Sequence, residues 1–210
     1  DPRVSASLLG HFSSAINAQS VARKTSFLQD QLGEQVFAQG VTIVDDPVRP
    51  RGLRSRPFDA EGVSVSRQEL VAGGILTGWV AESASARQLG IAPTGHAVRS
   101  AGGAPGASPS NLWMEPGSRS RDDLLAAFPE AVLIVELIGQ GVNGVTGDYS
   151  RGAVGFMVRG GRIAEPVSEI TIASNLKDIF ATLEPGSDLE LRRGIDAPTI
   201  LIPEMTVGAA

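Results

Sequence analysis

The sequence predicts an α+β fold of mostly antiparallel β-sheets, sandwich- or barrel-like, with roughly four or five short helices and about ten strands. Candidate strands follow one another through glycine turns, at Gly73-Gly74 and Gly160-Gly161, rather than alternating with helices. Helical periodicity is confined to short segments, of which Arg3–Ala18 is the clearest amphipathic case. We therefore expect hairpins to make most of the sheet.

In the first half of the chain, Thr25 or Ser26 is a candidate N-cap for a helix that Gly33 would end. The other elements expected there are a strand pair or bent strand over Glu34–Asp45, a hairpin of Val63–Val71 and Ile75–Glu82, and a helix over Ser83–Leu89 ended by Gly90.

Two long loops interrupt this half. Val48–Gly62 is expected to be ordered and carries Arg49, Arg51, Arg54 and Arg56, which could bind a peptide carboxylate or phosphate. The favoured alternative is that they pair with neighbouring acids at a subunit or domain surface. Ala92–Ser110, which contains His96, is expected to be a mobile surface loop that could lie over a cleft.

The second half is organised around Ala131–Arg162, interpreted as a buried strand, a long shaped loop and a second strand. The expected elements are strands over Asn111–Glu115, Ala131–Ile138, Ala153–Val158, Arg162–Ile172, Leu189–Arg193 and Thr199–Ile202, and helices from Ser120 to Ala127 and over Asn175–Leu183. The loop between the central strands, Gly139–Gly152, contains the only tyrosine of the chain, Tyr149.

The segment Gly139–Gly144 matches the G-x-G-x-x-G pattern of dinucleotide sites. Such a site requires a helix to begin at the loop, because the helix N-terminus holds the pyrophosphate. The residues that follow, Val145–Gly152, have no helical period and contain further glycines. The sequence therefore argues against a nucleotide site.

Composition excludes several classes. A net charge of −5 disfavours a nucleic-acid partner, and the lack of cysteine removes disulfides, thiolate ligands and a cysteine nucleophile. No apolar run is long enough for a membrane span and no signal peptide is visible, so a cytoplasmic protein is expected. The start at Asp1, without Met, suggests the downstream part of a longer protein.

Catalytic residues are hard to find. The chain has two histidines, and neither an H-E-x-x-H nor a G-x-S-x-G pattern occurs. His11, beside the apolar face of the first helix, is interpreted as a packed helix histidine. Glu136 and Asp148 flank the central loop as acid/base candidates, although a role as acceptors for loop N–H groups is favoured. The residues alone indicate a binding or assembly domain.

The segments GQGVNGVTGDYSRGAVGF (139–156), EPVSEITIASNLKDIF (165–180) and DDPVRPRGLRSRPFDAEG (45–62) resemble the TldD/PmbA family, on its PmbA (TldE) side. The resemblance implies that residues 1–210 are a C-terminal domain and that an N-terminal domain would precede Asp1. It further implies a subunit of a heterodimeric protease of unfolded peptides, including peptide-antibiotic precursors and antitoxins. The family also has the name modulator of DNA gyrase.

The resemblance also implies how TldD-type chains bind zinc: they use an H-E-x-x-x-H motif on a helix together with a cysteine. Here the matching helix, Ser7–Gln19, places Gly10 and Ala15 at the histidine positions and His11 at the glutamate position. The chain is thus expected to have no metal ligand, no cofactor and no catalytic residue, with zinc in a TldD-like partner. A homodimer of the isolated chain is also considered.

The two loops Val48–Gly62 and Gly139–Gly152 are expected to contact the partner or the peptide. The residues proposed for this contact are Arg54, Arg56, Asn143, Asp148, Tyr149 and Arg151. Added-strand binding through main-chain hydrogen bonds would give little sequence selectivity. Two alternatives stay open: an enzyme active alone, and a scaffold or regulator of toxin or gyrase-modulating systems without a role in cleavage.

Overall fold

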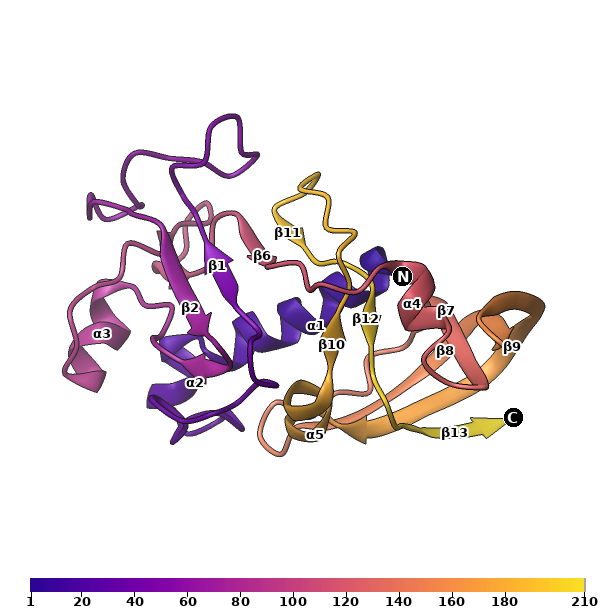
Figure 1. Ribbon diagram of the computed structural model, residues 1–210. Helices are drawn as coiled ribbons and strands as arrows, with labels where there is room; N and C mark the ends of the chain where they lie inside the picture. Colours follow the sequence, from indigo (N-terminus) through magenta and orange to yellow (C-terminus); the bar gives the residue numbers. More distant parts are fainter. Residues whose placement is uncertain (210) are drawn as a thin grey trace.

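The computed structural model describes residues 1–209, in which two sheets flank helix α1, Pro2–Ala15 (Figure 1). One face of α1 contacts strands β6 and β11 of the first sheet, and α1 also contacts strand β7 of the second. Apolar residues of both sheets and of α1 form one hydrophobic core. The predicted α+β class with mostly antiparallel sheet is confirmed.

Local signals in the sequence set the helix ends. The five helices of the described residues are α1 Pro2–Ala15, α2 Ala18–Ala22, α3 Ser83–Leu89, α4 Arg121–Leu125 and α5 Leu176–Thr182. Ser120 and Asp123 form a capping box at α4, and the Asn175 side chain caps α5 by accepting from the Lys177 N–H. Gly90 ends α3 in the left-handed conformation.

The first sheet has the order β11-β6-β1-β2-β3. Its strands are β1 Ile43–Asp45, β2 Gln68–Ala72, β3 Ile75–Leu76, β6 Leu112–Met114 and β11 Ile195–Asp196. All neighbours pair antiparallel except β11 with β6. The hairpin at Gly73-Gly74 forms as predicted, although its two strands are shorter than expected.

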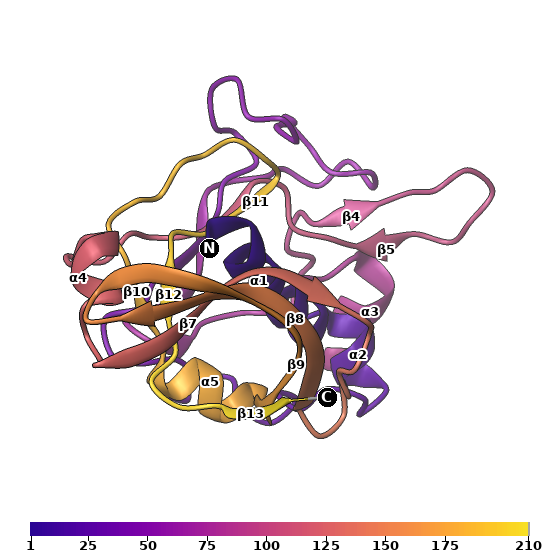
Figure 2. The same ribbon diagram turned by 90° about the vertical axis from the view of Figure 1, so that its right-hand side faces the viewer.

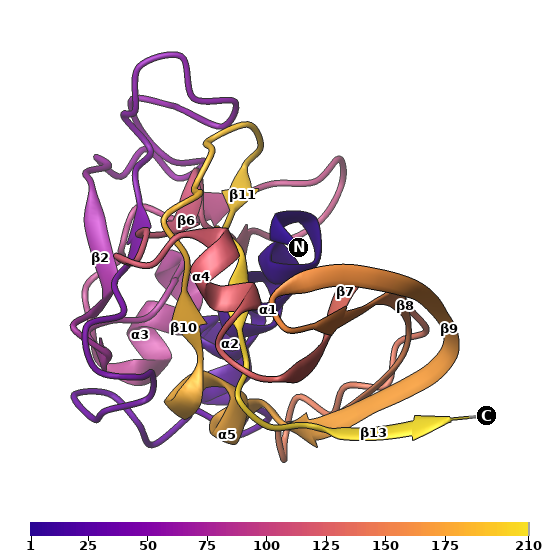
Figure 3. The same ribbon diagram turned by 45° about the vertical axis from the view of Figure 1, so that its right-hand side comes forward.

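The second sheet has the order β13-β9-β8-β7 and is antiparallel throughout. Its strands are β7 Glu130–Ile138, β8 Asp148–Arg159, β9 Arg162–Asn175 and β13 Thr206–Ala209. Gly160 and Gly161, both with positive φ, make the predicted turn between β8 and β9. Breaks in register bend the long hairpin, and Figures 2 and 3 show it as a strongly curved ribbon.

Two small strand pairs complete the fold. They are β4 Ala97–Val98 with β5 Gly106–Ala107, and β10 Glu184–Pro185 with β12 Ile200–Leu201. Four phenylalanines hold the centre of the core: the Phe37 and Phe180 rings stack at 4.4 Å, Phe12 meets both edge-on, and Phe27 packs against Phe180. This cluster fixes α5 against α1.

The predicted helix between Thr25 and Gly33 is wrong, since this segment is a series of turns. The buried Ser26 hydroxyl donates to the Ala15 carbonyl at 2.6 Å and accepts from the Leu28 N–H at 3.0 Å. The strand predicted over Glu34–Asp45 also begins only at Ile43, because the preceding backbone is bonded elsewhere; the Ala38 N–H donates to the Phe180 carbonyl of α5. Tertiary contacts override local propensity at both places.

Three further expectations need correction. Ala92–Ser110 contains the β4–β5 pair and a fully buried His96, so it is not simply a surface loop. Strand β8 begins at Asp148 rather than Ala153. Leu189–Arg193 is not a strand; β11 begins at Ile195. None of the helices within residues 1–209 is long and apolar enough to span a membrane.

Candidate functional site

The glycine-rich segment predicted as a loop folds back onto β8 and lengthens the central hairpin. Val142 forms a bridge with Tyr149, and the Ser150 N–H donates to the Gly141 carbonyl at 2.7 Å. A Cβ on Gly141 would lie 1.9 Å from the Ser150 carbonyl oxygen, so this approach requires glycine. The segment leads into a strand rather than a helix, which agrees with the argument against a nucleotide site.

Two of the proposed contact residues, Asn143 and Asp148, form hydrogen bonds that stabilise the glycine-rich segment. The Asn143 side-chain oxygen accepts from the Val145 N–H at 2.9 Å, closing a turn. The Asp148 carboxylate accepts from the Thr146 hydroxyl at 2.6 Å and from the Asn175 amide at 3.2 Å. Both residues are exposed, so they are held in place yet remain accessible.

Tyr149 turns inward from β8 and is only 3% exposed. Its ring meets the His11 ring of α1 edge-on, with centroids 6.0 Å apart and planes at 79°. His11 Nε2 is buried and has no hydrogen-bond partner within the described residues. Burial lowers the pKa of His11, and the positive charge of Arg151 lowers it further. Burial raises the pKa of the Tyr149 phenol, which Arg151 opposes. Both rings are therefore neutral at pH 7.

Arg151 follows Tyr149 by two residues on β8, and Glu136 lies on the neighbouring strand β7. The Arg151 guanidinium donates to the Ile138 carbonyl at 3.3 Å. Together with Arg3 and Ser7, both residues line a small surface hollow between α1 and β7. Glu136 is exposed to solvent rather than buried in a cleft, which does not favour a role as catalytic acid.

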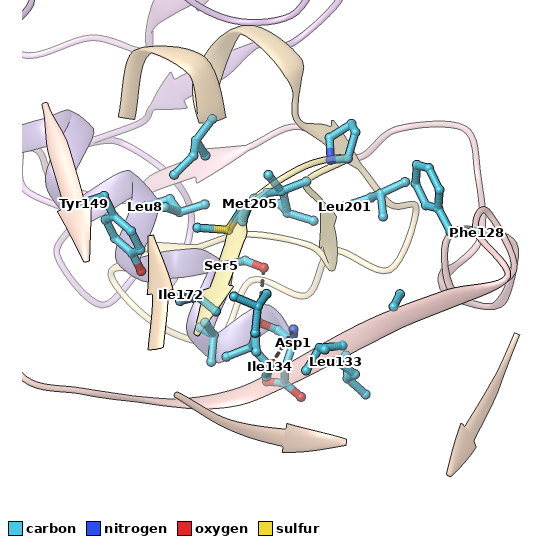
Figure 4. A pocket seen from close by; sticks show the side chains of 18 of the residues that line it. Asp1, Ser5, Leu8, Phe128, Leu133, Ile134, Tyr149, Ile172, Leu201 and Met205 are labelled. Carbon is cyan, nitrogen blue, oxygen red and sulfur yellow. Dashed lines mark hydrogen bonds between the residues drawn. The ribbon is translucent and has the colours of Figure 1, made fainter. Parts of the chain in front are cut away.

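Tyr149 also lines a cavity of about 400 Å³ between α1, β7 and the segment around β12 (Figure 4). The walls are mostly apolar, including Leu8 of α1, Leu133 of β7 and Met205. Consecutive residues of two segments, 130–134 and 200–203, line it, whereas the face of a strand would contribute alternate residues. The lining also includes Met157 of β8, Ile172 of β9 and Val207 of β13, so the cavity lies against the second sheet and reaches the edge of β7, where the Asp1 nitrogen donates to the Ile134 carbonyl at 3.2 Å.

The remaining predicted contact residues lie elsewhere. Arg54 and Arg56 belong to the loop 48–62, which projects from the upper end of the molecule in Figure 1, while the glycine-rich segment 139–147 lies at the lower end. The structure therefore brings Asn143, Asp148 and Arg151 near Tyr149 but does not bring the two arginines to them.

Sequence reasoning missed a buried polar cluster next to the loop 48–62. His96 Nε2 lies 3.2 Å from the Asp45 carboxylate, and His96 Nδ1 lies 2.8 Å from the Thr94 hydroxyl. The other Asp45 oxygen accepts from the Ser110 N–H at 2.7 Å. Asp45 and His96 are almost fully buried, so this triad joins three segments and is closed to any substrate.

Comparison with known proteins identifies the chain. Residues 1–209 match the family model described as the PmbA/TldA metallopeptidase C-terminal domain. The chain belongs to the PmbA/TldA metallopeptidase family. It is 44% identical to Metalloprotease PmbA of Escherichia coli O157:H7 and 40% identical to the PmbA homolog of Haemophilus influenzae, in each case over 97% of this chain and 44% of the relative. The chain thus spans less than half of the length of these relatives.

Two solved structures have similar folds. A Bacteroides thetaiotaomicron protein described as a DNA gyrase modulator superposes with a TM-score of 0.89 at 28% identity, covering 100% of this chain and 46% of its own. TldE from Thermococcus kodakarensis gives a TM-score of 0.81, covering 91% and 46%; at 23% identity, this match shows the fold alone. The resemblance to the PmbA side of the family is confirmed.

A metallopeptidase family implies a catalytic metal, but the residues at α1 do not fit one. His11 is the only imidazole of this helix, which contains no carboxylate or thiolate. No group of three or more His, Cys, Asp or Glu residues within residues 1–209 is arranged to hold a metal ion. The charge of Arg151, which lowers the pKa of His11, also opposes a cation there. A stable zinc site needs at least three such ligands.

Proposed function

We propose that this chain is the PmbA/TldE-type, non-metal-binding subunit of a heterodimeric metalloprotease, whose zinc is held by a TldD-like partner. The observation that carries the proposal is the chemistry of α1. Although residues 1–209 match a metallopeptidase family, this helix offers one imidazole, which is half-buried against Tyr149 and near the charge of Arg151. The substrates proposed are unfolded peptides such as peptide-antibiotic precursors and antitoxins, in the cytoplasm.

The contribution of this chain to cleavage would be to hold an extended peptide. The outer edge of β7 carries main-chain groups that β8 does not use, and the apolar cavity, which residues 130–134 of β7 help to line, reaches that edge. A peptide strand added there would be held mainly by main-chain hydrogen bonds, with apolar side chains entering the cavity. Such binding selects unfolded segments without requiring a particular sequence.

A second candidate is a scaffold or regulator of toxin or gyrase-modulating systems, without a role in cleavage. The description of the Bacteroides thetaiotaomicron protein as a DNA gyrase modulator favours it. The two candidates differ in whether this chain is needed for hydrolysis of a peptide bond.

Cleavage of an unstructured peptide decides between them. The full-length version of this chain, its TldD-like partner and their mixture are each assayed with and without a chelator. Cleavage by the mixture alone, abolished by the chelator, is expected. Equal cleavage by the partner alone would support the scaffold, and chelator-resistant cleavage by this chain alone would show an independent enzyme.

A further inference from the structure

The arginine loop, residues 48–62, carries positive charge that the chain does not neutralise. Arg49, Arg51, Arg54 and Arg56 form no ion pair with any residue between 1 and 209. The described residues therefore contain no such pair, and pairing with acids at a subunit or domain surface stays a prediction. The overall charge of −5 makes this local excess of positive charge more unusual.

The acids of the loop are occupied by backbone groups instead. The Asp59 carboxylate accepts from the Val63 N–H at 2.9 Å and from the Ala97 N–H at 3.0 Å. Glu61 accepts from the Ser83 N–H at 2.8 Å, at the start of α3. These bonds hold the loop to the fold and direct the carboxylates away from the guanidinium groups.

The backbone of the loop is also fixed in shape. The buried Asn111 side chain accepts from the Arg54 N–H at 3.0 Å and donates to the Ser55 hydroxyl at 3.0 Å. Gly52 packs so closely that a Cβ there would lie 2.8 Å from the Asn111 amide nitrogen. A Cβ on Gly194 would lie 2.3 Å from Arg54 Nε, so the Arg54 side chain lies directly across that glycine. The loop presents its arginines from a preorganised frame.

The guanidinium groups that a partner can reach are chiefly those of Arg51 and Arg54, which are exposed, because the Nε and Nη2 atoms of Arg56 are buried. A guanidinium group matches a carboxylate with two parallel hydrogen bonds, which makes an acidic side chain the natural partner.

Large apolar side chains on the same loop indicate that the partner is a protein. Leu53 is 74% exposed and Phe58 is 60% exposed, and Val48 is exposed as well. Arginine and aromatic residues together are typical of the energetic centre of protein interfaces, whereas a nucleic acid would require a longer basic surface without apolar projections.

We infer that the arginine loop docks into a folded partner that presents carboxylates around an apolar pocket, and that this partner is the zinc-bearing subunit. The second part rests on the proposed function. A folded partner fits better than an unfolded peptide because the loop backbone is itself rigid. In addition, no residue of 48–62 lines the apolar cavity along β7 that we assign to peptide.

The test measures the affinity between the full-length protein and its TldD-like partner by sedimentation or surface-based binding. The double variant Leu53→Ser/Arg54→Glu removes one exposed apolar side chain and reverses the neighbouring charge. The matched control is Arg162→Glu/Ile163→Ser, which makes the same two kinds of change at an exposed, adjacent pair at the β8–β9 turn.

The loop variant is expected to bind the partner about tenfold more weakly or worse, as is usual for interface hot spots, with unchanged thermal unfolding. The control should stay within about twofold of the wild type. Raising the salt concentration should weaken the wild-type complex more than that of the loop variant. If the wild type binds the partner and the loop variant binds equally well, the inference is wrong while the proposed function stands. If the wild type does not bind the partner at all, both fail.

Two other occupants of the loop would give different results. A loop variant that binds the partner normally but no longer cleaves peptide would assign the loop to substrate and overturn the inference. Loss of self-association with an intact heterocomplex would assign it to a second copy of this chain, and would also overturn it.

Discussion

Alanine at Gly141 should destabilise the protein far more than alanine at Gly144, three residues along the same segment. At Gly141 the new Cβ would lie 1.9 Å from the Ser150 carbonyl oxygen, which is backbone and cannot rotate away. The strands must separate by about 1 Å, and the hydrogen bond from the Ser150 N–H to the Gly141 carbonyl is then lost. Overpacking of this kind costs about 1–3 kcal/mol, and the lost hydrogen bond adds about 0.5–1.5 kcal/mol.

The expected total is about 1.5–4.5 kcal/mol, which for a domain of this size lowers the melting temperature by roughly 3 °C or more. Gly144→Ala is the control, and it is not expected to destabilise the protein. At Gly144 the nearest atom to a new Cβ is the Thr25 carbonyl oxygen at 3.8 Å, an ordinary contact. Alanine there restricts the unfolded chain and should be neutral or stabilise by up to about 1 kcal/mol.

Thermal unfolding of the two full-length variants, followed by calorimetry, checks this pair. Equal melting temperatures for Gly141→Ala and Gly144→Ala would refute the reasoning, because they would mean that the glycine-rich segment does not close against β8. The same variants should differ in peptide cleavage with the partner only as far as the destabilised segment disturbs Tyr149.

Three further outcomes follow from the site. Asp45→Ala leaves the Ser110 N–H and His96 without their buried acceptor, so it should lower the free energy of unfolding by about 2 kcal/mol or more in urea titration, against about 1 kcal/mol for Asp46→Ala. Because the pKa of His11 is lowered on folding, the unfolded chain binds more protons; stability should fall as pH drops below about 6.5, and His11→Phe should flatten that dependence. Elemental analysis of the purified full-length protein should find no stoichiometric zinc, and a chelator should leave its melting temperature unchanged; one zinc per chain would contradict our account of α1.

The elements that could be predicted from sequence are those specified by neighbouring residues. Gly160-Gly161 makes its turn because both residues adopt positive φ, and Ser120 with Asp123 caps α4 within one turn of chain. The segment after Thr25 carries an equally good helix signal and fails. Its Ser26 hydroxyl bonds to Ala15, a partner on another element that no local pattern reveals.

The same distinction between local and long-range contacts decides which residues of the site could be predicted. Tyr149 could be singled out as the only tyrosine, in a segment whose glycines require close approach. Its partner His11 could not, because the two rings meet only through the packing of β8 against α1. The apolar cavity draws its walls from elements far apart in the chain, and the pairing of His96 with Asp45 spans 51 positions. Contacts of this range leave no periodic signal in the sequence.

Among the described residues, arginine side chains form ion pairs on the long hairpin but not in the arginine loop. On the long hairpin, Arg159 lies between Glu130 of β7 and Glu165 of β9 and pairs with both, so charge there serves the sheet. In the arginine loop the acids are close in sequence, yet they bond to backbone N–H groups. Within residues 1–209 the arginines of this rigid loop form no ion pair and lie beside the exposed Leu53 and Phe58, which supports the inference that the loop docks to a partner. The loop lies at the far end from the glycine-rich segment that leads into Tyr149, so docking through it would leave the edge of β7 free for a peptide.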